Sequence, residues 1–253
     1  MNQQEYLRRR QALLAKMQPG SAALIFAAPE ATRSNDSEYP YRQSSDFWYF
    51  TGFNEPEAVL VLIKSDDTHN HSVLFNRVRD LTAEIWFGRR LGQEAAPEKL
   101  GVERALAFSE INEQLYQLLN GLDVVYHAQG EYAYADDIVF TALDKLRKGS
   151  RQNLTAPASI TDWRPIVHEM RLFKSAEELH VMRRAGEISA LAHTRAMENV
   201  VLACSNISLK VKSFTSFPVT ARALRPTTRL SAVVKTAAFC ITPKMKARCA
   251  TAI

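Results

Sequence analysis

The order of apolar and polar positions along the chain predicts helices and strands in mixed succession. Residues 3–17 carry apolar side chains on one stripe and are followed by Pro19-Gly20, which predicts a helix. Residues 22–27 form a short continuous apolar run, as in a strand that is covered on both faces. Polar residues fill 30–45, which predicts a long loop.

The rest of the first 150 residues continues this mixture of periods. Strands are predicted at 47–51, 58–63, 72–75 and 123–126. Helices are predicted at 80–88, 95–100, 109–119 and 131–148. This order predicts an α/β fold, a mixed β-sheet with flanking helices, that forms a domain over 1–155.

A second domain is predicted to begin after a linker over 156–174. Ser175-Ala176-Glu177-Glu178 has the pattern of a capping box, and the helix it opens has apolar residues at three- or four-residue spacing. We expect this helix to cover 175–198 and to be the first of an unfinished domain. Residues 199–253 are expected to be a separate, disordered basic tail.

The sequence changes its composition abruptly at Asn199. All 27 Asp and Glu lie before this residue, whereas the tail has nine of the 32 Lys and Arg. Residues 1–198 alone therefore have a net charge of minus four, and the basic character belongs to the tail. The tail also holds all three cysteines, Cys204, Cys240 and Cys249.

This distribution bears on partners and location. A basic-tailed nucleic-acid-binding protein is the alternative reading, since clustered cations bind phosphates. Residues 1–198 argue against it, because Arg8-Arg9-Arg10 and Arg89-Arg90 are interspersed with acids, as on a solvated helix face or turn.

No apolar run approaches the roughly 18 residues that cross a bilayer. The cysteine-free body without a signal segment predicts a cytoplasmic protein.

Few residues of the body suggest chemistry by themselves. His69 and His71 have the i, i+2 spacing of two ligands on one strand face, but they lie in a polar turn, which favours solvated histidines. The pairs Asp66-Asp67 and Asp136-Asp137 are interpreted as turn and helix-face residues, because adjacent side chains point apart. We therefore assign no catalytic and no metal-binding residue.

Two segments carry a specific resemblance. Residues 42–53, Arg-Gln-Ser-Ser-Asp-Phe-Trp-Tyr-Phe-Thr-Gly-Phe, resemble the N-terminal domain of the Xaa-Pro aminopeptidases (aminopeptidase P) of the prolidase and creatinase group. Residues 162–165 and 171–178 resemble the junction with that family's catalytic domain. The resemblance runs from about residue 5 to 198 and implies an N-terminal domain followed by the first helix of an incomplete pita-bread domain.

The resemblance implies an enzyme whose catalytic half this chain lacks. The family releases the N-terminal residue linked to proline, with two divalent metals, typically manganese, held by two Asp, one His and two Glu. The tail has none of these residue types, so no ligand is carried over. We expect the chain to be inactive alone, to act on proline-containing peptides only if a catalytic domain is supplied, and to form a homo-oligomer or associate with intact enzyme.

Two positions are candidates for substrate binding through the resemblance. Trp86 is expected to present its indole to the substrate of a neighbouring subunit, and the alternative is an aromatic residue buried in its own core. Arg151 is expected to reach a substrate carboxylate or carbonyl, and the alternative is a simple loop arginine after Gly149. Neither residue would cleave a bond.

The genetic code offers an explanation for the tail. Codons can be chosen for 236–244 so that a reading out of register gives Gly-Cys-Ile-Leu-His-Tyr-Thr-Glu, which looks like the family's catalytic domain. We therefore hypothesise that 199–253 is a frameshifted translation. The nucleotide sequence of the gene tests this hypothesis, since a single-base change near codon 199 should restore the catalytic domain downstream.

Overall fold

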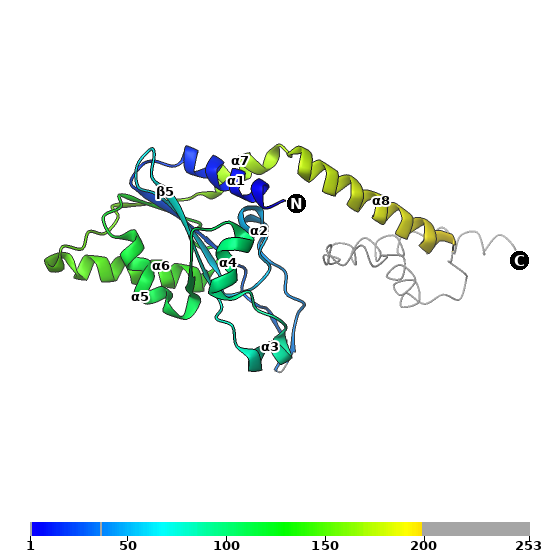
Figure 1. The fold of residues 1–253 in the computed structure, drawn as a ribbon, viewed down its shortest axis with the longest axis horizontal. Helices are drawn as coiled ribbons and strands as arrows, with labels where there is room; N and C mark the ends of the chain where they lie inside the picture. The colour runs from blue at the N-terminus through cyan, green and yellow to red at the C-terminus, as the bar shows by residue number, and fades with distance from the viewer. Residues whose placement is uncertain (1, 36, 199–253) are drawn as a thin grey trace, which may run out of the picture. The chain divides into compact units, whose positions relative to one another are not determined.

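The structure is a computed structural model that describes residues 2–35 and 37–198 (Figure 1). The predicted tail, 199–253, lies outside these residues. The chain divides into two compact units, and the first ends at Phe173. Helix α8, Ala176–Glu198, belongs to the second unit. Its predicted capping box is confirmed, because Glu178 N–H donates to Ser175 Oγ over 3.3 Å and Ser175 N–H donates to Glu178 Oε2 over 2.9 Å.

A six-stranded sheet organises the first unit, with the strand order β6-β5-β4-β1-β7-β8. The strands are β1 Ser21–Phe26, β4 Val59–Lys64, β5 Asn70–Asn76, β6 Arg104–Ala107, β7 Val124–His127 and β8 Ser159–Thr161. Only β4 among them is antiparallel to its neighbours, so the other five strands end at the same edge of the sheet. The predicted fold class, a mixed sheet with flanking helices, is confirmed.

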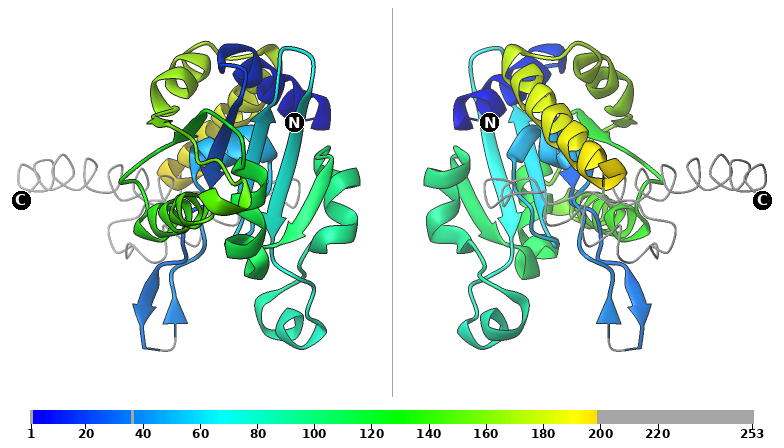
Figure 2. Two further views of the ribbon diagram at one scale, coloured as in Figure 1. Left: turned by 90° about the vertical axis from the view of Figure 1, so that its left-hand side faces the viewer. Right: turned by 90° about the vertical axis from the view of Figure 1, so that its right-hand side faces the viewer.

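Helices cover both faces of this sheet (Figures 1 and 2). One face packs against α1 Gln3–Lys16, α2 Ser45–Thr51, α4 Gly92–Leu100 and α7 Arg164–Leu172. The other face packs against α5 Ile111–Leu119 and α6 Ala133–Lys148. Strand β1 lies between these layers, and all six of its residues are buried. This double cover explains the continuous apolar run, since side chains on either side of the strand meet a helical layer.

The predicted strand at 47–51 is wrong, because these residues form helix α2. Ser44 caps the helix by accepting a hydrogen bond from Phe47 N–H, and Gly52 ends it with a positive φ of 62°. Phe47, Phe50 and Thr51 are buried at i, i+3 and i+4. That spacing is the period of a helix face, although the aromatic composition of the segment favours a strand.

Two stretches that were predicted to be irregular contain regular structure. The polar loop over 30–45 includes an exposed two-stranded ribbon, β2 Thr32–Ser34 and β3 Ser37–Glu38. The expected linker over 156–174 contains β8, which pairs with β7, and α7. Trp163 in this stretch is buried, and its Nε1–H donates to Leu24 O over 3.0 Å. These contacts place most of the expected linker in the first compact unit.

The expectation of a solvated face for Arg8-Arg9-Arg10 is wrong for two of the three residues. Arg9 and Arg10 are buried, and Arg10 donates hydrogen bonds to the carbonyl oxygens of Phe50, Leu100 and Gly101. Burial lowers the pKa of Arg10 to about 10. Backbone carbonyls at the ends of α2 and α4 are thus satisfied by a cation, which is favourable at helix C-termini.

Candidate functional site

A segment that leaves the sheet between β5 and α4 presents the predicted site residue Trp86. We call residues 77–91 the α3 arm, because helix α3, Leu81–Phe87, lies at its end. The side chain of Asp80 caps α3 by accepting hydrogen bonds from Thr82 N–H and Ala83 N–H over 2.9 and 3.1 Å. Gly88 ends the helix with a φ of 84°. Figures 1 and 2 both show α3 beyond the edge of the sheet.

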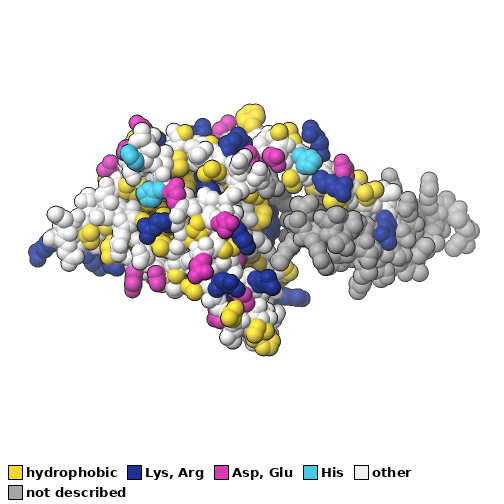
Figure 3. Space-filling view, in the orientation of Figure 1, with side chains coloured by type: hydrophobic (Ala, Val, Ile, Leu, Met, Phe, Trp, Pro, Cys, Tyr) yellow, Lys and Arg dark blue, Asp and Glu magenta, His cyan; other side chains and the backbone are white. Residues whose placement is uncertain are grey.

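The tip of the α3 arm is apolar and exposed. No residue of α3 is buried. Its four large apolar side chains are between 72% and 82% exposed: Leu81, Ile85, Trp86 and Phe87. Figure 3 shows apolar side chains gathered where α3 lies, at the lower edge of the molecule. Such a cluster is typical of surfaces that contact another molecule, because monomeric proteins rarely expose grouped large apolar residues.

The exposure of Trp86 decides between the two alternatives for this residue. Its side chain is 82% exposed, so the alternative of an aromatic residue buried in its own core is wrong. An exposed indole has an apolar face and a polar N–H available to a partner molecule. Contact with the substrate of a neighbouring subunit stays a prediction.

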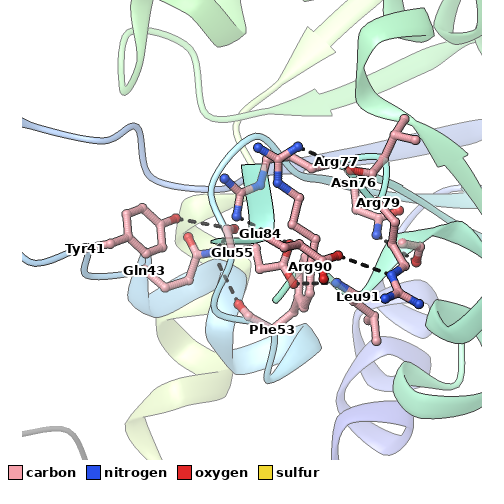
Figure 4. A network of polar contacts seen from close by, with 12 residues as sticks. Tyr41, Gln43, Phe53, Glu55, Asn76, Arg77, Arg79, Glu84, Arg90 and Leu91 are labelled. Carbon is pink, nitrogen blue, oxygen red and sulfur yellow. Dashed lines mark hydrogen bonds and ion pairs between the residues drawn. The ribbon is translucent and has the colours of Figure 1, made fainter. Parts of the chain in front are cut away.

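Polar contacts close the arm where it leaves and rejoins the sheet (Figure 4). Glu55, in the loop before β4, accepts a hydrogen bond from Leu91 N–H over 2.9 Å, and its second oxygen lies 3.5 Å from Arg77 Nη2. Further along the arm, Arg79 Nε lies 3.2 Å from Glu84 Oε1. This hydrogen bond is the main reason why the pKa of Glu84 is lowered. The arm is therefore apolar at its tip and charged at its base.

Arg151, the second predicted site residue, lies at the other end of the sheet. It belongs to the short 3₁₀ helix Ser150–Gln152, which follows the C-terminus of α6, and it is exposed. Helix α6 begins after the carboxyl end of β7 and runs back across the sheet, whereas the α3 arm begins at the carboxyl end of β5. Because β5 and β7 point the same way, Trp86 and Arg151 lie at opposite edges. The structure does not bring them together in one chain.

The sequence analysis missed a buried contact between a histidine and a carboxylate. His127 at the end of β7 is 2% exposed, and its Nε2 lies 2.7 Å from Asp136 Oδ1 in the first turn of α6. Asp136 also accepts a hydrogen bond from Gly130 N–H over 3.0 Å. Burial lowers the pKa of His127, although Asp136 acts in the opposite direction. The sequence feature that could have indicated this contact is a histidine at the end of a buried strand followed by an Asp in the first turn of the next helix.

Residues 6–126 match the family described as "Aminopeptidase P, N-terminal domain". Residues 6–126 are an aminopeptidase P N-terminal domain. The Xaa-Pro aminopeptidase of Escherichia coli (strain K12) is 86% identical over 198 residues, which are 78% of this chain and 45% of that protein. The Xaa-Pro aminopeptidase of Haemophilus influenzae is 40% identical over 195 residues, 77% of this chain and 43% of that protein.

A solved structure extends the likeness to aminopeptidase P. The Zn-substituted E. coli aminopeptidase P in complex with product matches with a TM-score of 0.84 and 79% sequence identity, over 86% of this chain and 49% of that chain. The chain thus spans less than half the length of the relatives it matches. The alignment with the E. coli enzyme covers 198 residues, and the composition of this chain changes after residue 198.

The residues that carry the likeness to aminopeptidase P have structural roles here. Gln43 accepts a hydrogen bond from Ala28 N–H over 2.8 Å and donates to Glu55 O over 2.9 Å. It thereby joins the end of β1 to the loop before β4. Both carboxylate oxygens of Asp162 accept from Arg164 Nε–H, over 3.0 and 2.9 Å, at the start of α7. These side chains position elements of the fold.

The described residues do not fit a two-metal centre. Among residues 2–35 and 37–198, no three His, Cys, Asp or Glu side chains are grouped as metal ligands. His69 is exposed and its Nδ1 lies 2.7 Å from Asp66 Oδ2, while His71 lies on β5. Asp66 and Asp67 lie in the turn between β4 and β5, as predicted. No helix in the described part of the chain is long and apolar enough to cross a membrane.

Proposed function

We propose that this chain is the N-terminal, non-catalytic domain of a Xaa-Pro aminopeptidase lineage, and that it acts in subunit association and in gating substrate access. The observation that carries the proposal is the α3 arm. A helix without any buried residue, with four large apolar side chains exposed, has an apolar surface that a second subunit would cover. The partner is a second copy of this chain or an intact aminopeptidase P.

Trp86 has the central role in this proposal. Its indole is exposed, as are the side chains of Leu81, Ile85 and Phe87 on the same short helix, so that the tip of the arm offers apolar surface to a partner. Trp86 would then line the substrate entrance of the neighbouring subunit. Arg151 remains a proposed ligand of a substrate carboxylate, but it lies at the opposite edge of the sheet. The two residues of one copy would therefore serve different sites.

Peptide cleavage is not expected of this chain alone. The related enzymes are Xaa-Pro aminopeptidases, and the metal of the complete enzyme is proposed to be manganese. Oxygen and imidazole donors are needed for such ions, and the described residues do not group them. The residues after Glu198 contain no Asp, Glu or His. Cleavage of proline-containing peptides would require a catalytic domain from another chain.

One experiment tests association. The purified chain is mixed with intact E. coli aminopeptidase P, and complexes are measured by sedimentation velocity. We expect a complex that Trp86→Ala weakens by at least about tenfold, as for a central aromatic residue of an interface. Trp48→Ala is the matched control, because Trp48 is also partly exposed but lies on α2. If the chain forms neither a self-associated species nor a complex with the intact enzyme, the proposal is wrong.

A second experiment tests the absence of catalysis. The chain is incubated with Mn²⁺ and an Xaa-Pro peptide, and we expect no release of the N-terminal residue. Appreciable manganese-dependent cleavage would show that the assignment is wrong. A salt-sensitive shift of DNA without cleavage would instead support the basic-tailed nucleic-acid-binding alternative.

The tail and the location belong to the same proposal. We propose that 199–253 arose by a frameshift, which sequencing of the gene tests by searching for the catalytic domain in another reading frame. The cysteine-free segment 1–198 supports a reducing compartment, the cytoplasm. Fractionation of cells that express the chain measures this location directly.

A further inference from the structure

Within the α3 arm, Leu91 packs against the hydrophobic core, whereas helix α3 at the tip has no buried residue. None of the residues of α3 is buried, so the hydrophobic effect does not hold the helix against the sheet. A short helix of this kind is marginal without tertiary contacts. The position of Trp86 must therefore be fixed where the arm joins the domain. We call the residues that join it, Glu55, Asn76, Arg77, Leu91 and Gly92, the neck.

The two ends of the arm are tied to each other at the neck. Asn76, the last residue of β5, is fully buried, and its Nδ2–H donates to Gly92 O over 3.0 Å. Gln93 Nε2–H donates back to Asn76 O over 2.9 Å. The chain thus leaves the sheet and returns to α4 at nearly the same place. These bonds close the arm, but they lie on the domain side of its first and last residues.

Glu55 is the residue that holds the arm itself. One carboxylate oxygen accepts the hydrogen bond from Leu91 N–H, and the other lies 3.5 Å from the guanidinium of Arg77. The first and the last residue of the arm are therefore bound by one side chain from a different loop. The side chains of Glu55 and Arg77 are only 15% and 14% exposed. The contact with Arg77 is an ion pair without a hydrogen bond, and its low exposure means that solvent and salt screen it less than a surface ion pair.

The loop that carries Glu55 is itself held firmly. Gln43 Nε2–H donates to the backbone oxygens of Phe53 and Glu55 over 3.2 and 2.9 Å. The hydroxyl of Thr51 accepts from Phe53 N–H over 3.1 Å. Figure 4 shows Glu55 between this loop and the two ends of the arm. Because the loop holds Glu55 in place, the Glu55 carboxylate can in turn position Leu91 and Arg77.

We infer that Glu55 is a positioning residue for Trp86: its carboxylate joins both ends of the α3 arm to the domain and so sets where the apolar tip is presented. The functional part of this inference rests on the proposed association through the arm. Loss of the carboxylate frees the arm while the sheet and its two helical layers stay folded. The arm then samples many orientations, and association through Trp86 becomes weaker because ordering it again costs entropy.

Hydrogen exchange of the full chain tests the effect on the arm. Glu55→Gln keeps the size of the side chain and removes its charge. We expect amide exchange over 78–91 to become about tenfold faster because the ion pair with Arg77 is lost, while β1, β4 and β7 exchange as before. Glu57→Gln is the matched control, since Glu57 lies two residues away and is exposed. Unchanged exchange in the arm of Glu55→Gln would overturn the inference.

A second variant covers the case in which Glu55→Gln does not fold. Arg77→Met removes the other side of the ion pair and is expected to give the same local acceleration. If both variants lose the sheet together with the arm, Glu55 supports the core, and the inference is wrong. If either variant accelerates exchange across all strands as much as in the arm, the inference is equally wrong.

Association is then measured for the same variants. We expect Glu55→Gln to weaken the complex with intact aminopeptidase P at an unchanged melting temperature, and Glu57→Gln to leave it unchanged. A merely structural role would not weaken association at constant stability. Faster exchange in the arm without weaker association would keep the neck as the anchor of the arm but refute its role in positioning Trp86 for a partner. Absence of any complex in the unsubstituted chain would contradict the proposed function and leave the exchange result to decide the anchoring.

Discussion

Helices α2 and α3 have the same length and similar caps but opposite surroundings. Each has seven residues, is rich in aromatic side chains, is capped by a side chain at its N-terminus and ends at a glycine. In α2, Phe47 and Phe50 are fully buried, whereas in α3 Trp86 and Phe87 are among the most exposed apolar side chains. Both helices thus have a side-chain cap at the start and a glycine at the end. Only the tertiary position decides whether its aromatic residues stabilise the domain or remain available to a partner.

The largest expected difference comes from a matched pair of substitutions. Phe50→Ala empties a buried site against the sheet and should lower the free energy of unfolding by about 3–5 kcal/mol. Phe87→Ala, at a side chain that is 72% exposed, should change it by less than about 0.5 kcal/mol. Urea denaturation of both variants measures the difference. Equal losses would mean that α3 packs against the domain in solution.

The next effect concerns how α2 is anchored. Arg10→Met keeps an apolar stem but removes the donors for the carbonyl oxygens of Phe50, Leu100 and Gly101. We expect the free energy of unfolding to fall by about 3 kcal/mol. Arg8→Met is the control, because the Arg8 side chain is 64% exposed and should contribute less than about 1 kcal/mol. A loss for Arg8→Met as large as that for Arg10→Met would contradict the assignment of Arg10 as the anchor.

Buried His127 should make the stability of the domain depend on pH. The pKa of His127 is lowered from its ordinary value of 6.5 by burial, so the unfolded chain binds the proton more readily. Stability from this group is present above pH 6.5 and falls as the pH decreases from there towards the lower folded pKa. Each unit of lowering corresponds to about 1.4 kcal/mol. The neighbouring charges are Asp136, Asp162 and Arg164.

Denaturation at several pH values measures this effect. We expect the urea midpoint to decrease between about pH 7 and pH 5. His127→Gln should flatten that part of the curve, since glutamine has no proton to gain. A curve with the same slope in the variant would assign the pH dependence to other groups.

The smallest expected effect comes from removing the N-terminal cap of α2 or of α3. Asp80→Ala and Ser44→Ala each remove a side chain that accepts from the first turn, which costs about 1 kcal/mol. The loss of the Ser44 cap should appear in global unfolding, because α2 is part of the core. The loss of the Asp80 cap should appear only as faster hydrogen exchange over 82–87. Global destabilisation by Asp80→Ala would show that the arm and the domain unfold together.

The sequence predicted the elements whose side chains follow one clear period. Helix α1 and strands β1, β4, β5 and β7 agree with the predicted ranges within a few residues. Strands β6 and β8 were missed because they are short edge strands with few buried residues, and their neighbours supply the pairing. Helix α2 was predicted as a strand because its composition was weighted above the i, i+3, i+4 spacing of its buried residues.

The candidate site was predictable only in part. Trp86 was found through the resemblance, and the exposure that gives it an available surface could not be read from its sequence neighbourhood. The contact of Glu55 with Arg77 and Leu91 joins residues that are far apart in the chain, so no local pattern marks it. The burial of Arg10 was missed for a similar reason, since its partners are backbone oxygens, which carry no residue signature.

The closed neck also makes the α3 arm a place where the chain tolerates insertion. Because Asn76 and Gly92 are bonded to each other, extra residues at the tip would not shift the register of β5 or the start of α4. Doubling the length of a surface loop costs only about 0.6 kcal/mol in closure entropy. The arm is thus suited to carry a reporter sequence, or a longer recognition segment, on an otherwise unchanged domain.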